Sequence, residues 1–250
     1  MELLTSRHNP LFQKIRKLNT SAPFRRQQGL FVCEGPKLLA EAGKWGAAID
    51  TVISVQGLDL PAVTAARRVE TPADVLASLA DTAAPQGVIF TCTLPGTALP
   101  DRLAKGRYLV LDGVQDPGNL GTVWRTADAL GAAGLLLTGP CADPFGPKAV
   151  RATMGACFRL PVWRGEPEAV RDLLERSGLP LYATALREDT EDVRRADLRE
   201  AAVVIGSEGS GISKKMLQFS RKTLKIPMED KCESLNAAVA AAVVLWEGYR

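Results

Sequence analysis

Residues 107–139, RYLVLDGVQDPGNLGTVWRTADALGAAGLLLTG, hold two strand-like runs with a turn-rich loop and a helix-like run between them. The runs YLVLDGV and AGLLLTG are apolar without polar alternation, which is typical of strands buried on both faces. The intervening LGTVWRTADAL has apolar residues at helical spacing. A strand, a crossover helix and a second strand form the unit from which parallel sheets are built. This stretch therefore predicts an α/β fold.

The same alternation continues to the C-terminus. Helix-like and strand-like runs follow each other between residues 149 and 228, and a helix-like SLNAAVAAAVVLWEGY (234–249) closes the chain. Such alternation predicts a parallel sheet with helices on both faces. Ligands of these sheets bind beyond the carboxyl ends of the strands, so we expect a site in the loops there.

A smaller α/β unit is expected ahead of this one. Its predicted elements are a basic helix (about 11–18), LFVCEG (30–35) as a strand, PKLLAEAGKWG (36–46) as a helix, DTVISV (50–55) as a strand, further helices, and GVIFTC (87–92) as a strand. The prolines and glycines of TLPGTALPDRLAKG (93–106) indicate a linker. We predict a first domain at 1–95, a linker at 96–105 and a second domain at 106–250.

Positive charge is concentrated near the N-terminus. The 250 residues carry a net charge of only +3. Within residues 1–28 the single acid Glu2 stands against six basic residues: Arg7, Lys14, Arg16, Lys17, Arg25 and Arg26. Such a basic segment suits an RNA phosphate backbone, but a solvated helix face has the same pattern. The segment alone leaves both interpretations open.

Cysteine and histidine usage excludes several kinds of site. The five cysteines form no C-x-x-C pair, which indicates reduced thiols filling the core of a cytoplasmic protein; they are Cys33, Cys92, Cys141, Cys157 and Cys232. His8 is the only histidine, so we expect neither a histidine-based metal site nor a catalytic triad. No signal peptide is visible, and the apolar run 237–246 is about half as long as a membrane span.

The loop after the first strand of the second domain supplies Asn119 and Arg125. Counted at about 100° per residue, Arg125 lies about 140° around the helix from Leu120. The apolar stripe of this helix is Leu120, Val123, Trp124, Ala127 and Gly131. Asn119 can cap the helix or reach a ligand, and Arg125 can serve a site or be a solvated surface residue. This stretch does not decide between these roles.

A second loop, VVIGSEGSGIS (203–213), leaves another predicted strand. Glycines at 206, 209 and 211 allow the backbone to approach a ligand closely, and Glu208 lies inside the turn. The glycine order is not the dinucleotide fingerprint, and Ile212 stands where a phosphate-binding loop has lysine. A plain glycine turn is the alternative.

A third loop, within IPMEDKCESLNAAVAAAVVLWE (226–247), precedes the last helix. Ser234 or Asn236 can cap that helix, and its alanine-rich first turns allow close packing inside the fold or across a dimer. Simple capping of a core helix is the alternative. All three loops follow strands of one predicted sheet, so they can converge on one site. That site would contain Asn119, Arg125, Glu208, Ser234 and Asn236.

These stretches resemble one family, the SpoU/TrmH-type RNA ribose 2′-O-methyltransferases of the SPOUT superfamily. DPGNLGTVWRTADALG (116–131), VVIGSEGSG (203–211) and residues 226–247 are similar to its three ordered motifs, and ADPFGPKAVRATMGACFRLPV (142–162) to the segment between the first two. SRHNPLFQKIRKL (6–18), GLFVCEGPKLLAEA (29–42) and TAAPQGVIF (82–90) resemble the substrate-binding domain that often precedes it. The resemblance covers nearly the whole chain.

The resemblance implies a parallel α/β sheet with a deep C-terminal trefoil knot that binds S-adenosylmethionine. It also implies a homodimer through knot-region helices and an RNA substrate, which we expect to be ribosomal rather than transfer RNA, without a metal or a membrane. Gly206, Ile226 and Leu235 match its cofactor-binding positions. Its active-site positions match Asn119, Arg125, Glu208, Ser234 and Asn236. Ser207 and NAAVAAA (236–242) depart from the commoner family residues without removing a functional group.

The chemistry that the resemblance implies centres on the nucleophile. A ribose hydroxyl reacts poorly unless its proton is removed or its developing charge is stabilised, and the resemblance assigns that task to Arg125. Because the arginine pKa lies above about 12, we expect Arg125 to hold a phosphate or the oxyanion rather than to take the proton. Asn119 and Asn236 would hold the ribose or a loop, while Ser234 and Glu208 order the site.

Two rival classes of protein stay open from the sequence. One is a non-catalytic RNA-binding protein that keeps this fold. The other is a nucleotide-dependent enzyme that uses 206–211 as a phosphate loop. Binding of S-adenosylmethionine or of ATP would separate them.

Overall fold

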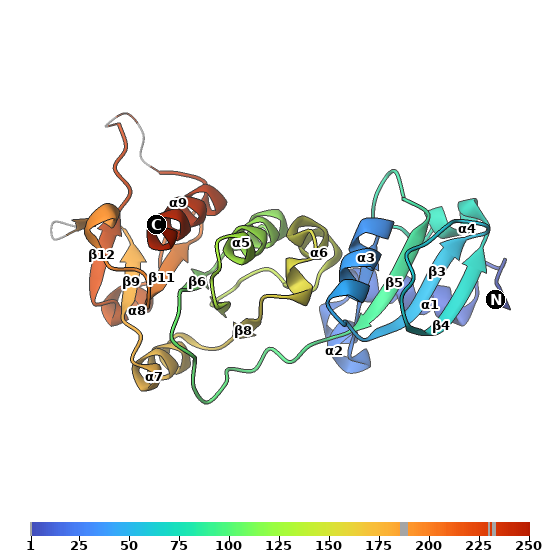
Figure 1. The fold of residues 1–250 in the computed structure, drawn as a ribbon, viewed down its shortest axis with the longest axis horizontal. Helices are drawn as coiled ribbons and strands as arrows, with labels where there is room; N and C mark the ends of the chain where they lie inside the picture. The colour runs from blue at the N-terminus through green and yellow to red at the C-terminus, as the bar shows by residue number, and fades with distance from the viewer. Residues whose placement is uncertain (1, 186–189, 230, 232–233) are drawn as a thin grey trace. The chain divides into compact units, whose positions relative to one another are not determined.

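The computed structural model describes residues 2–185, 190–229, 231 and 234–250. The chain forms two compact units. Unit 1 comprises Met1–Pro95 with Asp143–Arg159, and unit 2 comprises Gly96–Ala142 with Leu160–Arg250. Each unit is described by itself below (Figure 1).

Unit 1 is built around a mixed sheet with the strand order β1-β4-β3-β5-β2. Strand β3 runs parallel to β4, and β5 runs antiparallel to both β3 and β2. The elements of unit 1 are β1 (Glu2–Leu3), α1 (Pro10–Thr20), α2 (Ala22–Gln28), β2 (Leu30–Glu34), α3 (Pro36–Lys44), β3 (Ile49–Val55), β4 (Ala65–Thr71), α4 (Ala73–Ala77), β5 (Val88–Thr93), α6 (Pro147–Thr153) and the 3-10 helix η1 (Ala156–Phe158).

Helix α1 shows how the sequence begins this unit. Asn9 caps the helix, its Oδ1 accepting from the backbone N–H of Leu11, and Pro10 occupies the first position, where no amide hydrogen is needed. One stripe of the helix, Phe12, Ile15 and Leu18, is buried against the sheet, while the basic residues take the other face.

The prediction of further helices between residues 56 and 86 is met by α4 and corrected at residues 65–71, which form strand β4. Its sequence, AARRVET, is rich in alanine, arginine and glutamate, which favour helices intrinsically. The segment nevertheless pairs along its length with β3, from Ala65 opposite Ile49 to Thr71 opposite Val55. Burial of Val69 and Thr71 in the sheet therefore overrides the local preference.

Residues 143–159 group with unit 1, although the sequence boundaries placed them in a domain at 106–250. The rings of Phe145 and Phe31 pack with centroids 5.0 Å apart. Asp143 pairs with the Arg25 guanidinium at 2.6 Å, and Arg151 pairs with Asp81 at 2.6 Å. A segment far along the chain thus completes the core of the first unit.

Unit 2 contains the predicted parallel sheet. All of its strand pairs are parallel, in the order β10-β12-β9-β11-β6-β7-β8. The elements of unit 2 are β6 (Tyr108–Asp112), α5 (Pro117–Ala129), β7 (Gly134–Thr138), β8 (Val162–Arg164), α7 (Pro167–Ser177), β9 (Leu181–Thr184), β10 (Glu191–Asp192), the 3-10 helix η2 (Val193–Arg195), β11 (Ala202–Gly206), α8 (Lys214–Phe219), β12 (Lys222–Lys225) and α9 (Ala237–Tyr249).

Helices cover both faces of this sheet, as predicted. Helices α7 and α8 pack on one face, where Leu173 and Met216 meet strand residues such as Val110 and Val204. Helices α5 and α9 pack together and contact β7 and β11, respectively (Figure 1). The central strands β6, β7 and β11 are buried along nearly their whole length, which explains their continuous apolar sequences.

The described cysteines are free and buried, as core-filling thiols should be. Burial raises the pKa of Cys33 well above its usual value and that of Cys157 to about 12, so both thiols stay protonated at neutral pH. Cys232 lies outside the described residues. Among the described residues, no cluster of metal-binding side chains is present, and no helix is long and apolar enough to cross a membrane.

Candidate active site

The candidate site lies where the sheet of unit 2 changes its direction of winding. Strands β6 and β11 are neighbours, with Asp112 opposite Gly206 at their carboxyl ends. The helix that follows β6, α5, packs with α9, whereas the helix that follows β11, α8, packs with α7 on the opposite face. Diverging connections of this kind open a crevice at the carboxyl ends of two adjacent parallel strands.

Asn119 does not cap its helix, because α5 begins earlier than the apolar pattern indicated. Asp116 is the N-cap, and its Oδ1 accepts from the backbone N–H of Asn119 at 2.8 Å. Pro117 takes the first helical position. The side chain of Asn119 is therefore left available for contacts outside the helix. At the other end, Gly131 lies beyond the helix and is exposed, so it is not part of the buried stripe.

Three of the five predicted active-site residues meet at one point. The amide Nδ2 of Asn119 donates to Glu208 Oε1. The amide Nδ2 of Asn236 lies 3.3 Å from Asn119 Oδ1 and 3.4 Å from Glu208 Oε1. Asn236 is also the N-cap of α9, since its Oδ1 accepts from the backbone N–H of Ala238 at 2.9 Å. The three loops predicted to converge do converge here.

The glycine loop after β11 has a defined shape. Ser207 and Gly211 exchange backbone hydrogen bonds of 3.1 and 3.0 Å, which closes a tight turn around Glu208. A Cβ atom on Gly206 would lie 2.3 Å from the carbonyl carbon of Gly211, so no other residue fits at 206 without moving this turn. Gly211 has a φ of +65°, which favours glycine. Gly206 is thus required by the turn itself.

A cavity of about 220 Å³ adjoins the cluster. All three predicted cofactor positions, Gly206, Ile226 and Leu235, line it, together with Glu208 and Ser234. The remaining lining residues are mostly apolar or expose backbone, including Ile205, Leu224, Met228, Ala237 and Ala240. Lys225 is the one basic residue among the described lining residues, which disfavours the rival phosphate-loop enzyme.

Arg125 is not brought into the cluster. It lies six residues after Asn119, which corresponds to about 9 Å along α5 and about 120° around it. The residue is exposed, and within the described part of the chain no hydrogen bond or ion pair engages its guanidinium. A ligand that reached both Asn119 and Arg125 would have to extend along the helix.

Sequence reasoning missed Asp112, which ends β6 opposite Gly206. This buried carboxylate ends β6, and its Oδ2 accepts from the backbone N–H of Ser213 at 2.7 Å. Ser213 in turn caps α8, so Asp112 fixes the far end of the glycine loop. The signal was present in the sequence as a single acid at the end of the apolar run YLVLD.

The predicted RNA-binding residues of unit 1 divide into three groups. Arg25 is a correction: it is 5% exposed, pairs with Asp143, and donates to the carbonyl oxygens of Leu18 and Asn19, so its charge is used inside the unit. Arg7 and Arg16 contact Asp74 and Ser78, respectively, at the surface. Among the described residues, no ion pair or hydrogen bond engages the side chains of Lys14, Lys17 and Arg26, and the Lys17 ammonium lies 4.5 Å from the centroid of the Phe24 ring.

Known proteins are similar to this chain over nearly its whole length. The SpoU rRNA Methylase family matches residues 106–246, and the MRM3-like substrate binding domain matches residues 9–89. The 23S rRNA (guanosine(2553)-2′-O)-methyltransferase RlmP of Bacillus subtilis is 31% identical, with 98% of each chain covered. The 23S rRNA (uridine(2479)-2′-O)-methyltransferase of Streptomyces viridochromogenes is 30% identical, over 99% of this chain and 91% of that protein.

A solved structure is similar over the same extent. The AdoMet-bound rRNA methyltransferase from Sinorhizobium meliloti superposes with a TM-score of 0.88 at 30% identity, covering 99% of this chain and 97% of that one. The parallel sheet, the cavity at its switch point and these matches define an RNA methyltransferase that uses S-adenosylmethionine. The chain belongs to the SpoU rRNA Methylase family, which confirms the resemblance found in its motifs.

Proposed function

We propose that the chain transfers a methyl group from S-adenosylmethionine to a ribose 2′-hydroxyl of ribosomal RNA. The observation that carries the proposal is the junction of the 220 Å³ cavity with the Asn119–Glu208–Asn236 cluster at one crevice. The cavity supplies a place for the cofactor, and the cluster lies beside it with polar groups suited to a ribose. Relatives that match nearly the whole chain methylate ribose hydroxyls of 23S rRNA, by their names.

The cavity suits S-adenosylmethionine better than a phosphorylated nucleotide. Backbone groups of the Gly206 turn and apolar side chains such as Ile226 and Leu235 would hold the adenosine portion. Glu208 lines the cavity, and its carboxylate would attract the positively charged sulfonium of the cofactor. When bound, the cofactor provides an electrophilic methyl group, so no metal is needed for the transfer.

The side chains of the cluster prepare the nucleophile. Glu208 accepts from the amides of Asn119 and Asn236, which orients these two side chains and joins the loops that carry them. We assign to Arg125 the task of holding a phosphate of the RNA or the developing oxyanion, because no residue that the structure describes uses its fork of N–H donors. The hydroxyl proton would pass to a phosphate oxygen or to water.

Three further features belong to the proposal. Lys14, Lys17 and Arg26 would contact the RNA backbone from unit 1.

The chain would form a homodimer through α9 and contain the trefoil knot of its family. This proposal is supported by the return of the chain after β12, because α9 packs on β11 and α5. The cytoplasm is the proposed location, since the described cysteines are free thiols.

The test is methyl transfer from radiolabelled S-adenosylmethionine to ribosomal RNA isolated from cells that lack this protein. We expect label in a single nucleotide, whose 2′-O-methyl group blocks alkaline cleavage of the adjacent bond. Calorimetry should show binding of S-adenosylmethionine and not of ATP. Cofactor binding without methylation of any ribosomal or transfer RNA would favour the non-catalytic RNA-binding protein instead.

A further inference from the structure

Unit 1 contains a larger cavity, of about 710 Å³, that the proposed chemistry does not use. One wall is the segment from Glu34 to Glu41, which includes the start of α3. A second wall comes from Thr82, Ala84 and Gln86. The third comes from the 143–159 segment, which packs with unit 1.

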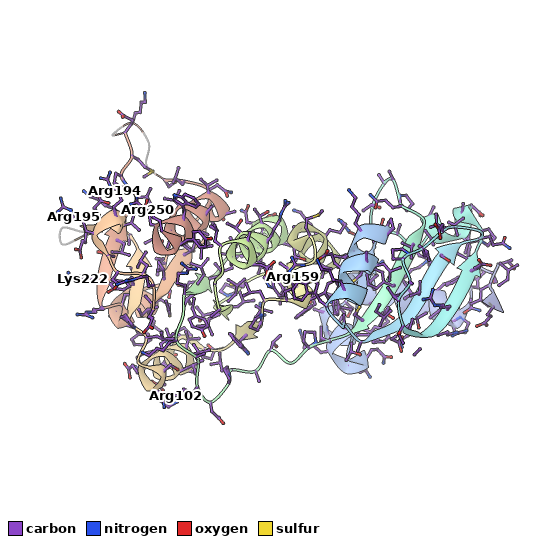
Figure 2. All side chains as sticks on the ribbon, viewed as in Figure 1. Arg102, Arg159, Arg194, Arg195, Lys222 and Arg250 are labelled. Carbon is purple, nitrogen blue, oxygen red and sulfur yellow. The ribbon has the colours of Figure 1, made fainter. Side chains whose placement is uncertain are left out.

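An exposed tryptophan stands beside this cavity. Trp45, at the end of α3, is 50% exposed. The guanidinium carbon of Arg159 lies 5.4 Å from the centroid of its ring, and the ammonium of Lys44 lies 5.7 Å from it. Arg159, which is labelled in Figure 2, also lines the cavity. An indole and a guanidinium are both flat, and here they adjoin an open space.

Met154 places an apolar side chain on the cavity wall at a cost in backbone strain. With a φ of 49°, it is the one residue other than glycine with positive φ in the described chain. It is also 51% exposed, so burial does not explain its presence. The next residue, Gly155, lets Glu41 approach, since a Cβ there would lie 3.0 Å from Glu41 Cβ. Strained backbone of this kind concentrates at functional sites.

The charges of the cavity favour an anionic ligand. Its acidic residues are engaged by the protein: Glu41 pairs with Arg159, and Glu34 accepts from the hydroxyl of Thr82. Lys37 lines the cavity, and no ion pair holds it among the residues that the structure describes. Lys44 adds a second ammonium beside the Trp45 ring.

We propose that this cavity, with Trp45, binds an unpaired nucleotide of the RNA substrate. The base would stack on the indole and on the Arg159 guanidinium, Met154 would contact its edge, and Lys37 and Lys44 would meet the phosphates. Aromatic and arginine planes beside basic groups are how proteins hold single-stranded RNA, whereas a protein helix would need a continuous apolar groove. That the ligand is RNA rests on the proposed function.

The experiment measures binding of a short fluorescein-labelled single-stranded RNA to the full-length protein by anisotropy. Trp45→Ala should weaken binding about tenfold or more, the loss expected for one stacked base, and Trp45→Phe should lose less. Leu58→Ala is the matched control, because Leu58 is also apolar and is 40% exposed in unit 1 outside the cavity. An RNA duplex of the same sequence should bind more weakly and respond little to Trp45→Ala.

A second variant tests whether weaker binding could come from loss of fold. Met154→Gly relieves the left-handed strain, so it should keep or raise the melting temperature while weakening binding of the single strand. Unchanged affinity in both Trp45→Ala and Met154→Gly overturns the inference.

Methylation kinetics separate this inference from the proposed function. If both hold, Trp45→Ala raises the KM for RNA and leaves the affinity for S-adenosylmethionine unchanged. If the wild-type enzyme is active and Trp45→Ala has a normal KM for RNA, the nucleotide site is contradicted and the proposed methyltransferase function is retained. If the wild-type protein methylates no RNA but binds the single strand in a way that depends on Trp45, the nucleotide site is supported and the proposed methyl transfer is contradicted.

Discussion

Arg125 is exposed on α5 and has no partner in the described chain, so its guanidinium is available to a ligand. Arg125→Ala should lower the single-turnover methylation rate at saturating RNA by about 100-fold or more, as loss of a charge-stabilising donor does. Arg125→Lys should also be impaired, because an ammonium cannot reproduce the planar fork. Calorimetry should show S-adenosylmethionine binding unchanged. A near-normal rate in Arg125→Ala would return the residue to an ordinary surface role.

Arg25 and Arg26 are neighbours in sequence with opposite expected roles. Arg25→Ala removes the buried partner of Asp143 and should lower the free energy of unfolding by roughly 2–4 kcal/mol, measured by urea denaturation. Arg26→Ala should leave stability unchanged and weaken RNA binding, with a shallower salt dependence. Equal effects of the two substitutions on RNA affinity, with no difference in stability, would contradict the burial of Arg25.

At the scale of a single element, the glycine loop after β11 offers a matched pair of substitutions. Gly206→Ala would place a Cβ 2.3 Å from the backbone of Gly211, so the turn must shift and S-adenosylmethionine affinity should fall roughly tenfold or more. Gly209→Ala should be tolerated, because nothing lies within 4 Å of its Cβ. Calorimetry on both variants checks this, and equal affinities would show that the turn does not shape the cavity.

At the scale of the whole molecule, helix α9 has two apolar faces, and they concern the oligomeric state. Ala238 and Ala241 are buried within the chain, whereas Val239 and Trp246 are 49% and 54% exposed at i and i+7 on one face. An exposed apolar face of this kind indicates a partner surface, and we assign it to a second copy of the chain.

The corresponding prediction concerns oligomeric state. Val239→Glu with Trp246→Glu should raise the dimer dissociation constant about a hundredfold or more, because each change buries an unpaired charge. Sedimentation velocity measures the shift to monomer, and Leu58→Glu, at an exposed apolar residue of unit 1, should not cause it. The proposed homodimer would be contradicted if the wild-type protein sediments as a monomer at micromolar concentration.

Local patterns in the sequence were sufficient for much of this protein. Continuous apolar runs identified the buried strands of unit 2, and the alternation with helices identified a parallel sheet, because neighbours along the chain decide both. Asn119, Glu208 and Asn236 could be selected because each follows a strand in a polar loop. The order of the three motifs was enough to identify the family.

Only the tertiary structure decided what depends on residues far apart in the chain. Arg25 reads as a surface cation until Asp143, 118 residues later, is placed against it. Part of the stretch between residues 56 and 86, where helices were predicted, forms strand β4 because it pairs with β3. The segment 143–159 reads as part of the second domain until Phe145 packs on Phe31. In each case, burial and pairing with distant residues outweigh the structure that the local sequence favours. A sequence pattern reports only that local preference.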